Sequence, residues 1–251
     1  MRLYRAEGIV LRNRELTGAD RLLSLYTREY GRLRVAAYGA GKPSSRKRGA
    51  VQPFTRSEFL LGSGRDLDYV RQCAEREIFP HLRDDLENLL YAHHLAELVE
   101  TFTPEGEPNG GLFALLLEAL RGLGDGDPDL LVRAFEIKLL GLLGYRPELG
   151  ACVRCGRVSA PGEYHFAAGA GGVVCARCAP EVRGARVCRA GTVALLRYLS
   201  VAELRVLRRI RVEDAVREEM RRLLEDYLAF HLEGRARSLA LLACIKGKPG
   251  G

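Results

Sequence analysis

The segment RLLSLYTREYGRLRVAAY, residues 21–38, decides the fold of the amino-terminal part of the chain. Apolar and polar residues alternate in both of its halves, with Leu23 and Leu25 before a central turn and Leu33 and Val35 after it. Successive side chains of a strand point to opposite faces, so this period of two predicts two strands. Gly31 fits the positive φ of a tight hairpin turn between them. The residues expected on the outer face are Ser24, Tyr26, Arg28, Arg32, Arg34 and Tyr38.

Three further strands are expected at about residues 4–12, 54–61 and 67–73, with a turn at residues 62–64 between the last two. Five short strands in so short a segment fit a small closed barrel, because closure removes exposed strand edges. The sequence therefore predicts an α+β protein in which residues 1–80 form a five-stranded oligonucleotide-binding (OB) barrel.

The stretch GAGKPSSRKRGAVQPFT, residues 39–55, lies between the third and fourth of these strands. Its glycines and prolines predict a loop, because they cannot continue a helix or a central strand. The loop has no carboxylate, and its four cations, which we expect to reach outwards to phosphate, are Lys42, Arg46, Lys47 and Arg48. A Walker A loop is excluded, because it needs a glycine where Ala36 stands and Ser or Thr where Pro43 follows Lys42.

Basic side chains on the strands extend this cationic surface. They are Arg12, Arg14, Arg21, Arg32 and Arg34. With the exposed rings expected at Tyr26 and Tyr38, they suit a single strand of nucleic acid, whose phosphates need cations and whose bases stack on aromatic rings. The alternative is that the tyrosines pack under loops and the arginines only keep the sheet soluble.

The charge of the chain is distributed unevenly. Residues 1–80 contain 16 Lys and Arg against 9 Asp and Glu, whereas residues 81–251 contain 23 of each. The whole net charge of +7 therefore lies in residues 1–80, which we expect to contact a polyanion. No apolar stretch is long enough to span a membrane, and Met1–Glu7 lacks the apolar run of a signal peptide. A cytoplasmic, nucleoid-associated protein with no membrane partner is expected.

Beyond residue 80, apolar residues recur at steps of three and four, which predicts a helical domain over residues 81–251. Asp127 and Pro128 have the chemistry of a helix N-cap and first turn, and Gly144 is expected to end that helix. Further helices are expected at residues 112–123 and 212–232. The segment SVAE, residues 200–203, resembles a capping box and predicts another helix from there to Ile210.

Four of the seven cysteines form two C-x-x-C pairs, Cys152 with Cys155 and Cys175 with Cys178. This spacing turns both thiolates of each pair toward one ion, and four sulfurs complete a tetrahedral, structural Zn²⁺ site. The glycine-rich segment between the pairs can bury little apolar area, so the metal would supply most of its folding free energy. The alternatives are a site that has lost its metal and a redox thiol pair. The remaining cysteines, expected to be small buried hydrophobes, are Cys73, Cys188 and Cys244.

These features favour a nucleic-acid-binding protein over two other classes. A nuclease would need clustered carboxylates for metal ions, and neither these nor a Ser/His/Asp or Cys/His constellation is evident, so no catalytic residue is assigned. The second class is an RNA-binding or transcription-associated zinc protein. Competition between single-stranded DNA and RNA would test it, since recognition through 2′-hydroxyls would favour RNA.

Three motifs in order resemble the bacterial recombination mediator family RecO over nearly the whole chain. They are residues 19–21 leading through Gly31-Arg32 to Gly39-Ala40, RGAVQPF at residues 48–54, and FEIKLLGLLGYRP at residues 135–147, which leads into the cysteine pairs.

The resemblance implies an OB barrel, a helical domain and a zinc-binding insertion in that domain, here residues 150–182. It also implies binding to single- and double-stranded DNA and annealing of complementary strands. Finally, it implies action with RecR on DNA coated by single-strand-binding protein, so that RecA can load.

Overall fold

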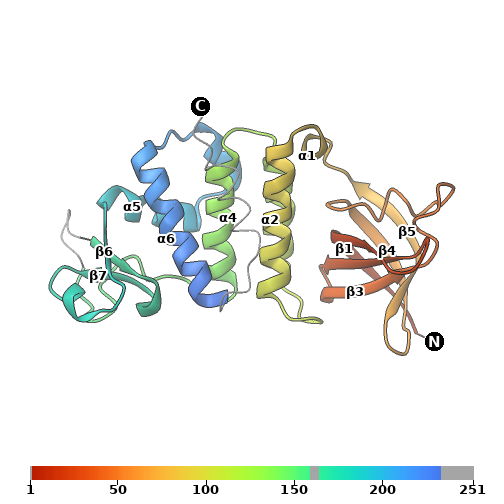
Figure 1. The fold of residues 1–251 in the computed structure, drawn as a ribbon, viewed down its shortest axis with the longest axis horizontal. Coiled ribbons are helices and arrows are strands. Elements are labelled where there is room, and N and C mark those ends of the chain that lie inside the picture. Colours follow the sequence, from red (N-terminus) through yellow and green to blue (C-terminus); the bar gives the residue numbers. More distant parts are fainter. Residues whose placement is uncertain (1, 159–163, 233–251) are drawn as a thin grey trace. The chain divides into compact units, whose positions relative to one another are not determined.

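The structure is a computed structural model that describes residues 2–158 and 164–232 (Figure 1). The chain consists of two compact units, Met1–Gly124 and Asp125–Gly251. The first unit therefore holds more than the 1–80 barrel domain expected from the sequence. No helix in the described ranges is long and apolar enough to cross a membrane.

The first unit begins with a closed barrel of five strands. The strands are β1 (Leu3–Glu15), β2 (Arg21–Thr27), β3 (Gly31–Ala37), β4 (Arg56–Gly62) and β5 (Asp68–Glu77). Their order around the barrel is β1-β2-β3-β5-β4. β3 and β5 run parallel, and the other neighbouring pairs run antiparallel. The OB-type barrel predicted from the sequence is confirmed, with β1 and β5 longer than expected.

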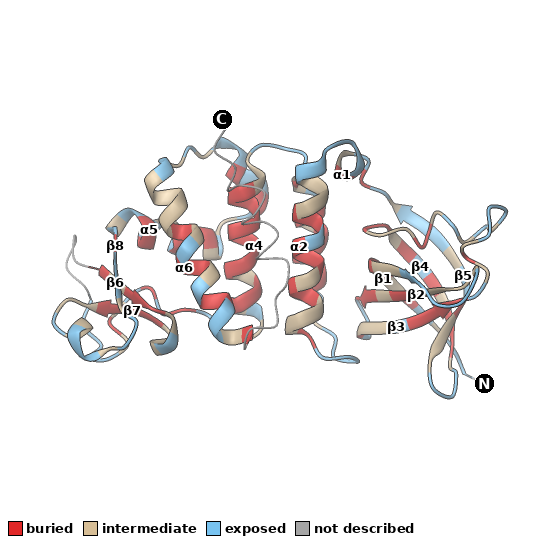
Figure 2. Ribbon diagram, in the orientation of Figure 1, coloured by how far each residue is buried: buried red, intermediate tan, exposed pale blue. Residues whose placement is uncertain are grey.

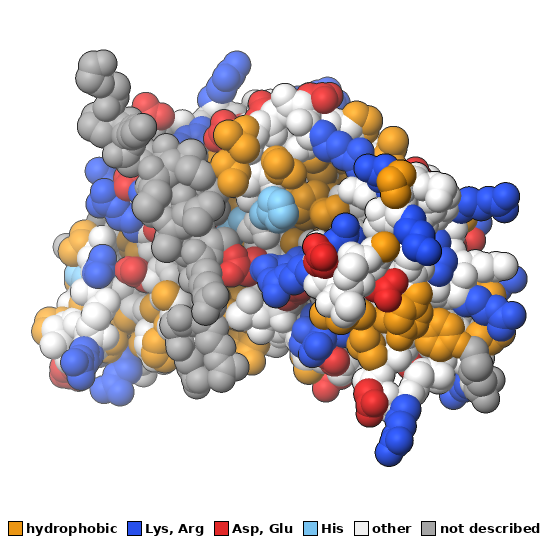
Figure 3. Space-filling view, turned by 45° about the vertical axis from the view of Figure 1, so that its right-hand side comes forward, with side chains coloured by type: hydrophobic (Ala, Val, Ile, Leu, Met, Phe, Trp, Pro, Cys, Tyr) orange, Lys and Arg blue, Asp and Glu red, His pale blue; other side chains and the backbone are white. Residues whose placement is uncertain are grey.

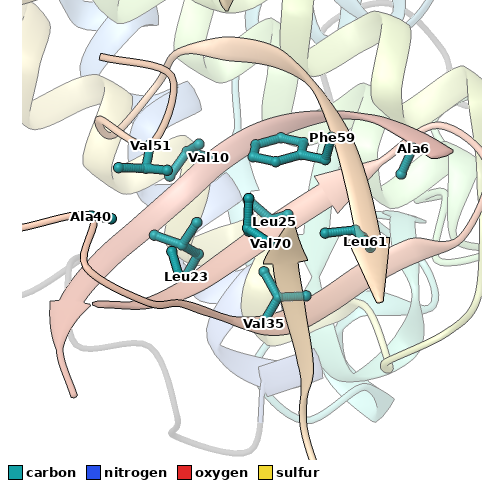
Figure 4. Close-up of a cluster of buried hydrophobic side chains, with 11 residues drawn as sticks. Ala6, Val10, Leu23, Leu25, Val35, Ala40, Val51, Phe59, Leu61 and Val70 are labelled. Carbon is teal, nitrogen blue, oxygen red and sulfur yellow. The ribbon is translucent and has the colours of Figure 1, made fainter. Parts of the chain in front are cut away.

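Alternating side chains fill the inside of the barrel. Leu23 and Leu25 of β2 and Val35 of β3 are fully buried, as their alternation predicts. Figure 4 shows them pointing toward apolar side chains of the other strands and of the loop. The buried members of the cluster are Ala6, Val10, Leu23, Leu25, Val35, Ala37, Ala40, Val51, Phe59, Leu61 and Val70. Each large side chain buried in this way contributes about 1.5–3 kcal/mol, so the barrel has a substantial apolar core (Figure 2).

A β-bulge in β1 decides which of its side chains face outwards. Val10 lies opposite Leu25, whereas Arg12, two residues later, lies opposite Ser24, only one residue away. Leu11 is thus an extra residue, and an extra residue reverses the alternation beyond it. Without the bulge, Arg12 would share the inward face of Val10.

Three helices complete the first unit, α1 (His81–Asp84), α2 (Leu86–Phe102) and α3 (Gly110–Gly122). Asp85 caps α2 by accepting hydrogen bonds from the backbone N–H groups of Glu87 and Asn88. Asn109 caps α3 in the same way through the N–H of Leu112.

Helix α2 packs on the outside of the barrel beside β1. The ring of His93 on α2 meets the ring of Phe54 edge-on, with centroids 4.9 Å apart. Tyr26 points outwards from β2, opposite Ile9, yet it is fully buried. Its hydroxyl group lies at the backbone of Asn109, and burial raises its pKa to about 12. The prediction of an exposed ring at Tyr26 is therefore wrong, because the segment that follows the barrel covers this part of its outer face.

The second unit combines helices with a small sheet. Its elements are α4 (Pro128–Leu142), β6 (Tyr164–Ala167), η1 (Ala168–Ala170), β7 (Gly172–Cys175), η2 (Ala179–Glu181), β8 (Arg186–Cys188), α5 (Ala190–Val201), η3 (Leu204–Arg209) and α6 (Asp214–Leu232). Asp127 accepts a hydrogen bond from the N–H of Leu130 at the start of α4. Gly144 follows the end of α4 with a φ of +85°. Both predicted ends of this helix are confirmed.

The helix predicted from Ser200 to Ile210 is wrong. Ser200 and Val201 form the last turn of α5, whose residues Leu196 and Leu199 are buried, and residues 204–209 form the 3₁₀ helix η3. Buried Leu204 and Leu207 stand three residues apart, which is the repeat of a 3₁₀ helix. Tertiary burial therefore overrides the capping-box signal.

Candidate nucleic-acid interface and metal centre

The loop between β3 and β4 is a chain of turns with no helix, and the barrel holds its backbone at both ends. At its start, the N–H of Gly41 donates to the carbonyl oxygen of Ala19 at 2.7 Å. At its end, Asn13 Nδ2 donates to the carbonyl oxygen of Val51 at 2.8 Å. Val51 itself is buried in the barrel core. The backbone is thereby fixed while the tip of the loop stays in solvent.

Three of the four loop cations, Lys42, Arg46 and Arg48, are exposed. None of them forms an ion pair with a carboxylate of the described residues. Lys47 differs, because its Nζ donates a hydrogen bond to the carbonyl oxygen of Val70 at 2.8 Å and lies 3.5 Å from that of Tyr38. Lys47 therefore does not reach outwards as expected: it ties the loop to β5, whereas the other three cations stay exposed to solvent.

The strand arginines predicted for the interface are mostly engaged within the first unit. Arg12 pairs with Glu100 of α2. Arg32 Nε donates to the carbonyl oxygen of Thr103 at 2.9 Å, and its guanidinium lies 3.4 Å from Glu105. The sequence does not reveal these partners, because they follow the strands by some 70 to 90 residues and come close to the arginines only when α2 packs on the barrel.

Arg34 and Arg21 have weaker contacts, to Glu105 at 3.9 Å and to Glu15 at 3.6 Å. Arg14 is exposed and has no carboxylate partner within residues 2–158 and 164–232. Four of the five strand arginines still meet around one hollow of 260 Å³ on the outside of β1–β3. Its lining is Arg12, Arg14, Leu22, Leu23, Ser24, Arg32, Arg34 and Glu100. Glu100 makes this hollow less cationic than the sequence indicates.

Tyr38 is the aromatic residue whose predicted exposure is confirmed. Its side chain is 55% exposed beside the ring of Tyr69, with centroids 6.2 Å apart. Tyr38 directly precedes the cationic loop, and Lys47 Nζ lies near its carbonyl oxygen, so this ring lies close to the start of the loop. Figure 3 shows Lys and Arg side chains projecting from the barrel side of the view, with hydrophobic side chains among them.

The four cysteines of the two pairs come together as predicted. The sulfur atoms of Cys152, Cys155, Cys175 and Cys178 all lie within 4.8 Å of one another. The first pair is shaped by a tight turn, in which the N–H of Gly156, at a φ of +71°, donates to the carbonyl oxygen of Cys152 at 2.8 Å. The second pair closes with a hydrogen bond from the N–H of Cys178 to the carbonyl oxygen of Cys175. The cluster could therefore hold a metal ion with all four sulfurs.

The acidity of these thiols fits a cation-binding role. Burial by itself raises the pKa of the Cys152 thiol, but backbone N–H groups of Cys175, Cys155 and Arg154 lower it to about 6. The pKa of Cys178 is raised to about 12, chiefly by its hydrogen bond to Cys175. The raised pKa of Cys178 reflects the cost of placing several thiolates together, and a divalent cation offsets that cost because it binds thiolates rather than thiols.

The sheet beside the cysteine cluster extends past residue 182, where the insertion expected from the sequence ends. β8 (Arg186–Cys188) pairs with β6, so the last strand of the three-stranded sheet β7-β6-β8 ends at Cys188. Cys188 is buried and its pKa is raised to about 12 by that burial. Cys73 is half-buried against the barrel core, and burial raises its pKa to about 11. Cys244 lies outside the described residues.

Comparison with known protein families gives two matches that together cover nearly the whole chain. Residues 1–79 match the model described as "Recombination protein O N terminal", and residues 83–240 match "Recombination protein O C terminal". The chain belongs to the RecO family. The protein therefore has a role in DNA repair and recombination.

Several curated RecO proteins resemble this chain over their full length. The DNA repair protein RecO of Pelotomaculum thermopropionicum is 47% identical over 251 residues, which are 100% of this chain and 98% of that protein. RecO of Desulforudis audaxviator is 44% identical, covering 96% of this chain and 97% of its own length. RecO of Symbiobacterium thermophilum is 37% identical, with coverages of 98% and 99%.

Proposed function

We propose that this protein binds single- and double-stranded DNA through its amino-terminal barrel and acts as a recombination mediator. The observation that carries the proposal is the set of loop cations, Lys42, Arg46 and Arg48, which stand exposed on a fixed backbone without a carboxylate partner in the described ranges. Such cations neutralise phosphates and release counterions without reading sequence. Arg14 extends the same surface along β1.

Annealing of complementary strands follows from this chemistry. Duplex formation is already downhill, and repulsion between two polyanions slows it. A cationic surface that holds strands loosely lowers that barrier, and no covalent bond has to break, so we infer a binding protein rather than an enzyme. With RecR, the protein would act on DNA coated by single-strand-binding protein and so help RecA to load. We place this activity in the cytoplasm, at the nucleoid.

A structural zinc ion belongs to the same proposal. Cys152, Cys155, Cys175 and Cys178 would hold it, and the metal would stabilise the fold of the module around them. Four sulfur ligands leave no open coordination position, so the ion has no catalytic part. We also propose that the chain has two domains that meet near residue 80, the barrel domain of residues 1–80 and the helical domain of residues 81–251. The two family models, which end at residue 79 and begin at residue 83, support this division.

The loop variant Lys42→Gln/Arg48→Gln tests the proposal. Binding to single- and double-stranded DNA should weaken for every sequence, and the salt slope of log K should fall by about 0.7 to 0.9 for each phosphate that is no longer neutralised. The matched control is Arg209→Gln/Arg211→Gln, which removes two exposed arginines of the second unit. Fluorescence anisotropy across a salt series provides the measurement. Equal affinities for the loop variant and the control would refute the interface.

The mediator role needs its own measurement. Annealing of complementary strands coated with single-strand-binding protein should be accelerated by the protein, and RecR should change that rate. The loop variant should slow annealing in proportion to its loss of DNA affinity. If annealing of coated strands is the same with and without the protein, the mediator role is wrong even where DNA binding persists.

A further inference from the structure

A second hollow lies on the outside of the barrel, away from the β1–β3 arginines. It has a volume of 700 Å³ and runs over β1, β4 and β5 under the cationic loop. Its cations are Arg5, Arg46, Lys47 and Arg71, and its carboxylates are those of Glu7, Glu29 and Glu58. Sequence analysis singled out neither Arg5 nor Arg71, although both are exposed.

Strand register places Leu60 and Gln72 between these two arginines, and the apolar part of the outer floor is Leu60 with Ala74. Arg5 lies opposite Leu60, and Leu60 in turn lies opposite Gln72. The next pair is Leu61 with Val70, so Arg71 is the extra residue of a bulge in β5. A bulge re-aims the side chain that it carries, and here it leaves Arg71 exposed at the edge of the hollow.

The hollow is cationic even though carboxylates line it. Glu7 is matched by Arg56 and Arg28, and Glu58 is matched by Arg76, all three arginines lying outside the lining. Glu29 is engaged by the backbone N–H of Glu7 at 2.9 Å. In contrast, none of the lining cations forms an ion pair with a carboxylate of the described residues, although the pKa of Glu58 is lowered by Arg76 and, to a smaller extent, by nearby Arg5. Lys47 is held by the carbonyl oxygen of Val70, so Arg46 and Arg71, with Arg5 beside them, are the cations that a ligand could reach.

We propose that this hollow is a groove for a segment of single-stranded DNA, with phosphates at Arg5, Arg46 and Arg71 and bases over Leu60 and Ala74. The inference rests on the proposed DNA-binding function and deepens it, because it names the strand state and two new contact residues. A duplex turns its bases inward and offers mainly phosphate, so an apolar floor would gain nothing from it. An unpaired strand offers both phosphates and base faces.

The charge part of the proposal is tested with Arg5→Gln/Arg71→Gln. Oligothymidylate binding should weaken, and the salt slope should fall by about 1.4, because each single-strand phosphate that is no longer neutralised lowers it by about 0.7. Arg5→Lys/Arg71→Lys should keep most of the affinity, and Arg209→Gln/Arg211→Gln should keep all of it. Circular dichroism checks that each variant is folded.

The base part is tested with Leu60→Ser, assayed on oligothymidylate and on an abasic oligomer of equal length. The variant should lower affinity for oligothymidylate about three- to tenfold, because the bases then meet less apolar surface, and should leave affinity for the abasic oligomer unchanged. Equal losses on both oligomers would overturn the placement of bases in the groove.

The outcomes separate this inference from the function on which it rests. If Arg5→Gln/Arg71→Gln binds oligothymidylate like the wild type while Lys42→Gln/Arg48→Gln does not, the groove proposal is overturned and the DNA-binding proposal stands. If neither variant loses affinity, both proposals fall. An equal loss of single-strand and duplex binding would make the groove a general phosphate surface and overturn its preference for single strands.

Discussion

The barrel and the cysteine module, which is the small sheet β7-β6-β8 with the four clustered cysteines, reach a stable fold by different means. The barrel encloses large side chains such as Leu25, Phe59 and Leu61 from every part of its circumference. Among the described residues, the cluster beside the cysteines buries Cys152, Ala167 and Val174, and Phe166 and Val173 of the same sheet are buried as well. Apolar burial scales with the area removed from water, so we expect the barrel to depend mainly on its apolar core and the cysteine module to depend more on its four sulfurs.

This difference decides what the surface of each region can be used for. A self-supporting barrel can carry unpaired cations and a cationic hollow, because the free energy of folding comes from its interior. In the module, the groups that a stabilising metal ion would bind are the four cysteine sulfurs, and these lie within 4.8 Å of one another. We therefore expect the barrel to tolerate surface changes that alter DNA binding, and the module to respond above all to its metal.

Metal removal should produce the largest effect. Structural zinc contributes about 10–16 kcal/mol in zinc-finger peptides at pH 7, so a strong chelator should unfold residues 150–188. Hydrogen exchange should show fast amides there and unchanged protection in β1–β5. Cys178→Ser should reproduce the effect, whereas Cys73→Ser should retain stoichiometric zinc. If the protein keeps slow hydrogen exchange at the amides of the module after zinc has been removed, the module does not depend on its metal.

Truncation of a core side chain should affect the barrel next most strongly. Phe59 is 2% exposed, and Phe59→Ala should lower the free energy of unfolding by about 3–5 kcal/mol. Phe230 is 54% exposed, so Phe230→Ala should change it by no more than about 0.5 kcal/mol. Urea unfolding followed by circular dichroism measures both. Similar values for the two variants would mean that burial does not hold the barrel together.

The loop offers a finer test, because neighbouring cations have different roles. Lys47→Met loses a charged hydrogen bond to the carbonyl group of Val70 and should cost about 1.5–3 kcal/mol of stability. Arg46→Met removes an exposed, unpaired side chain and should cost less than about 0.5 kcal/mol. Thermal unfolding of both variants distinguishes the anchoring cation from the exposed one. A smaller loss for Lys47→Met than for Arg46→Met would reverse these assignments.

Release of the paired strand arginines should have the smallest effect on stability. Glu100→Gln/Glu105→Gln breaks exposed or half-exposed pairs worth about 0.2–1 kcal/mol each, but it frees Arg12, Arg32 and Arg34. Affinity for DNA should rise, with a salt slope steeper by about 0.7 for each arginine that then meets phosphate. Asp66→Asn/Glu107→Gln removes the same charge elsewhere in the first unit and serves as the control. Equal gains in both variants would show that only net charge matters.

Much of the fold was predictable because it depends on local patterns. Alternation identified Leu23, Leu25 and Val35 as core residues, and N-cap chemistry identified the start of α4 at Asp127. The capping box at Ser200 failed, because the burial of Leu199 and Leu204 by residues distant in sequence determined the local structure. Propensity gives way where packing against other elements supplies more free energy.

The interface was predictable in its composition and less so in its geometry. The loop cations could be found from their spacing among glycines and prolines. The burial of Tyr26 depended on the segment at Asn109 and the availability of Arg12 on α2, and neither the period nor the charge of β1–β3 reveals these contacts. Arg71 was missed because its direction depends on a bulge, and a bulge is set by the pairing partner rather than by the strand itself.

The amino-acid order alone determined the barrel, the cysteine cluster, the excess of positive charge and membership of the RecO family. The first three follow from short periods, fixed spacings and residue counts, which are local or additive, and the family follows from the similarity of the sequence to the two RecO models. Tertiary structure alone decided which cations are neutralised, which one anchors the loop and where a hollow opens between β1, β4 and β5. Those outcomes depend on distances between groups far apart in the chain, and such distances exist only after the apolar core has brought the elements together.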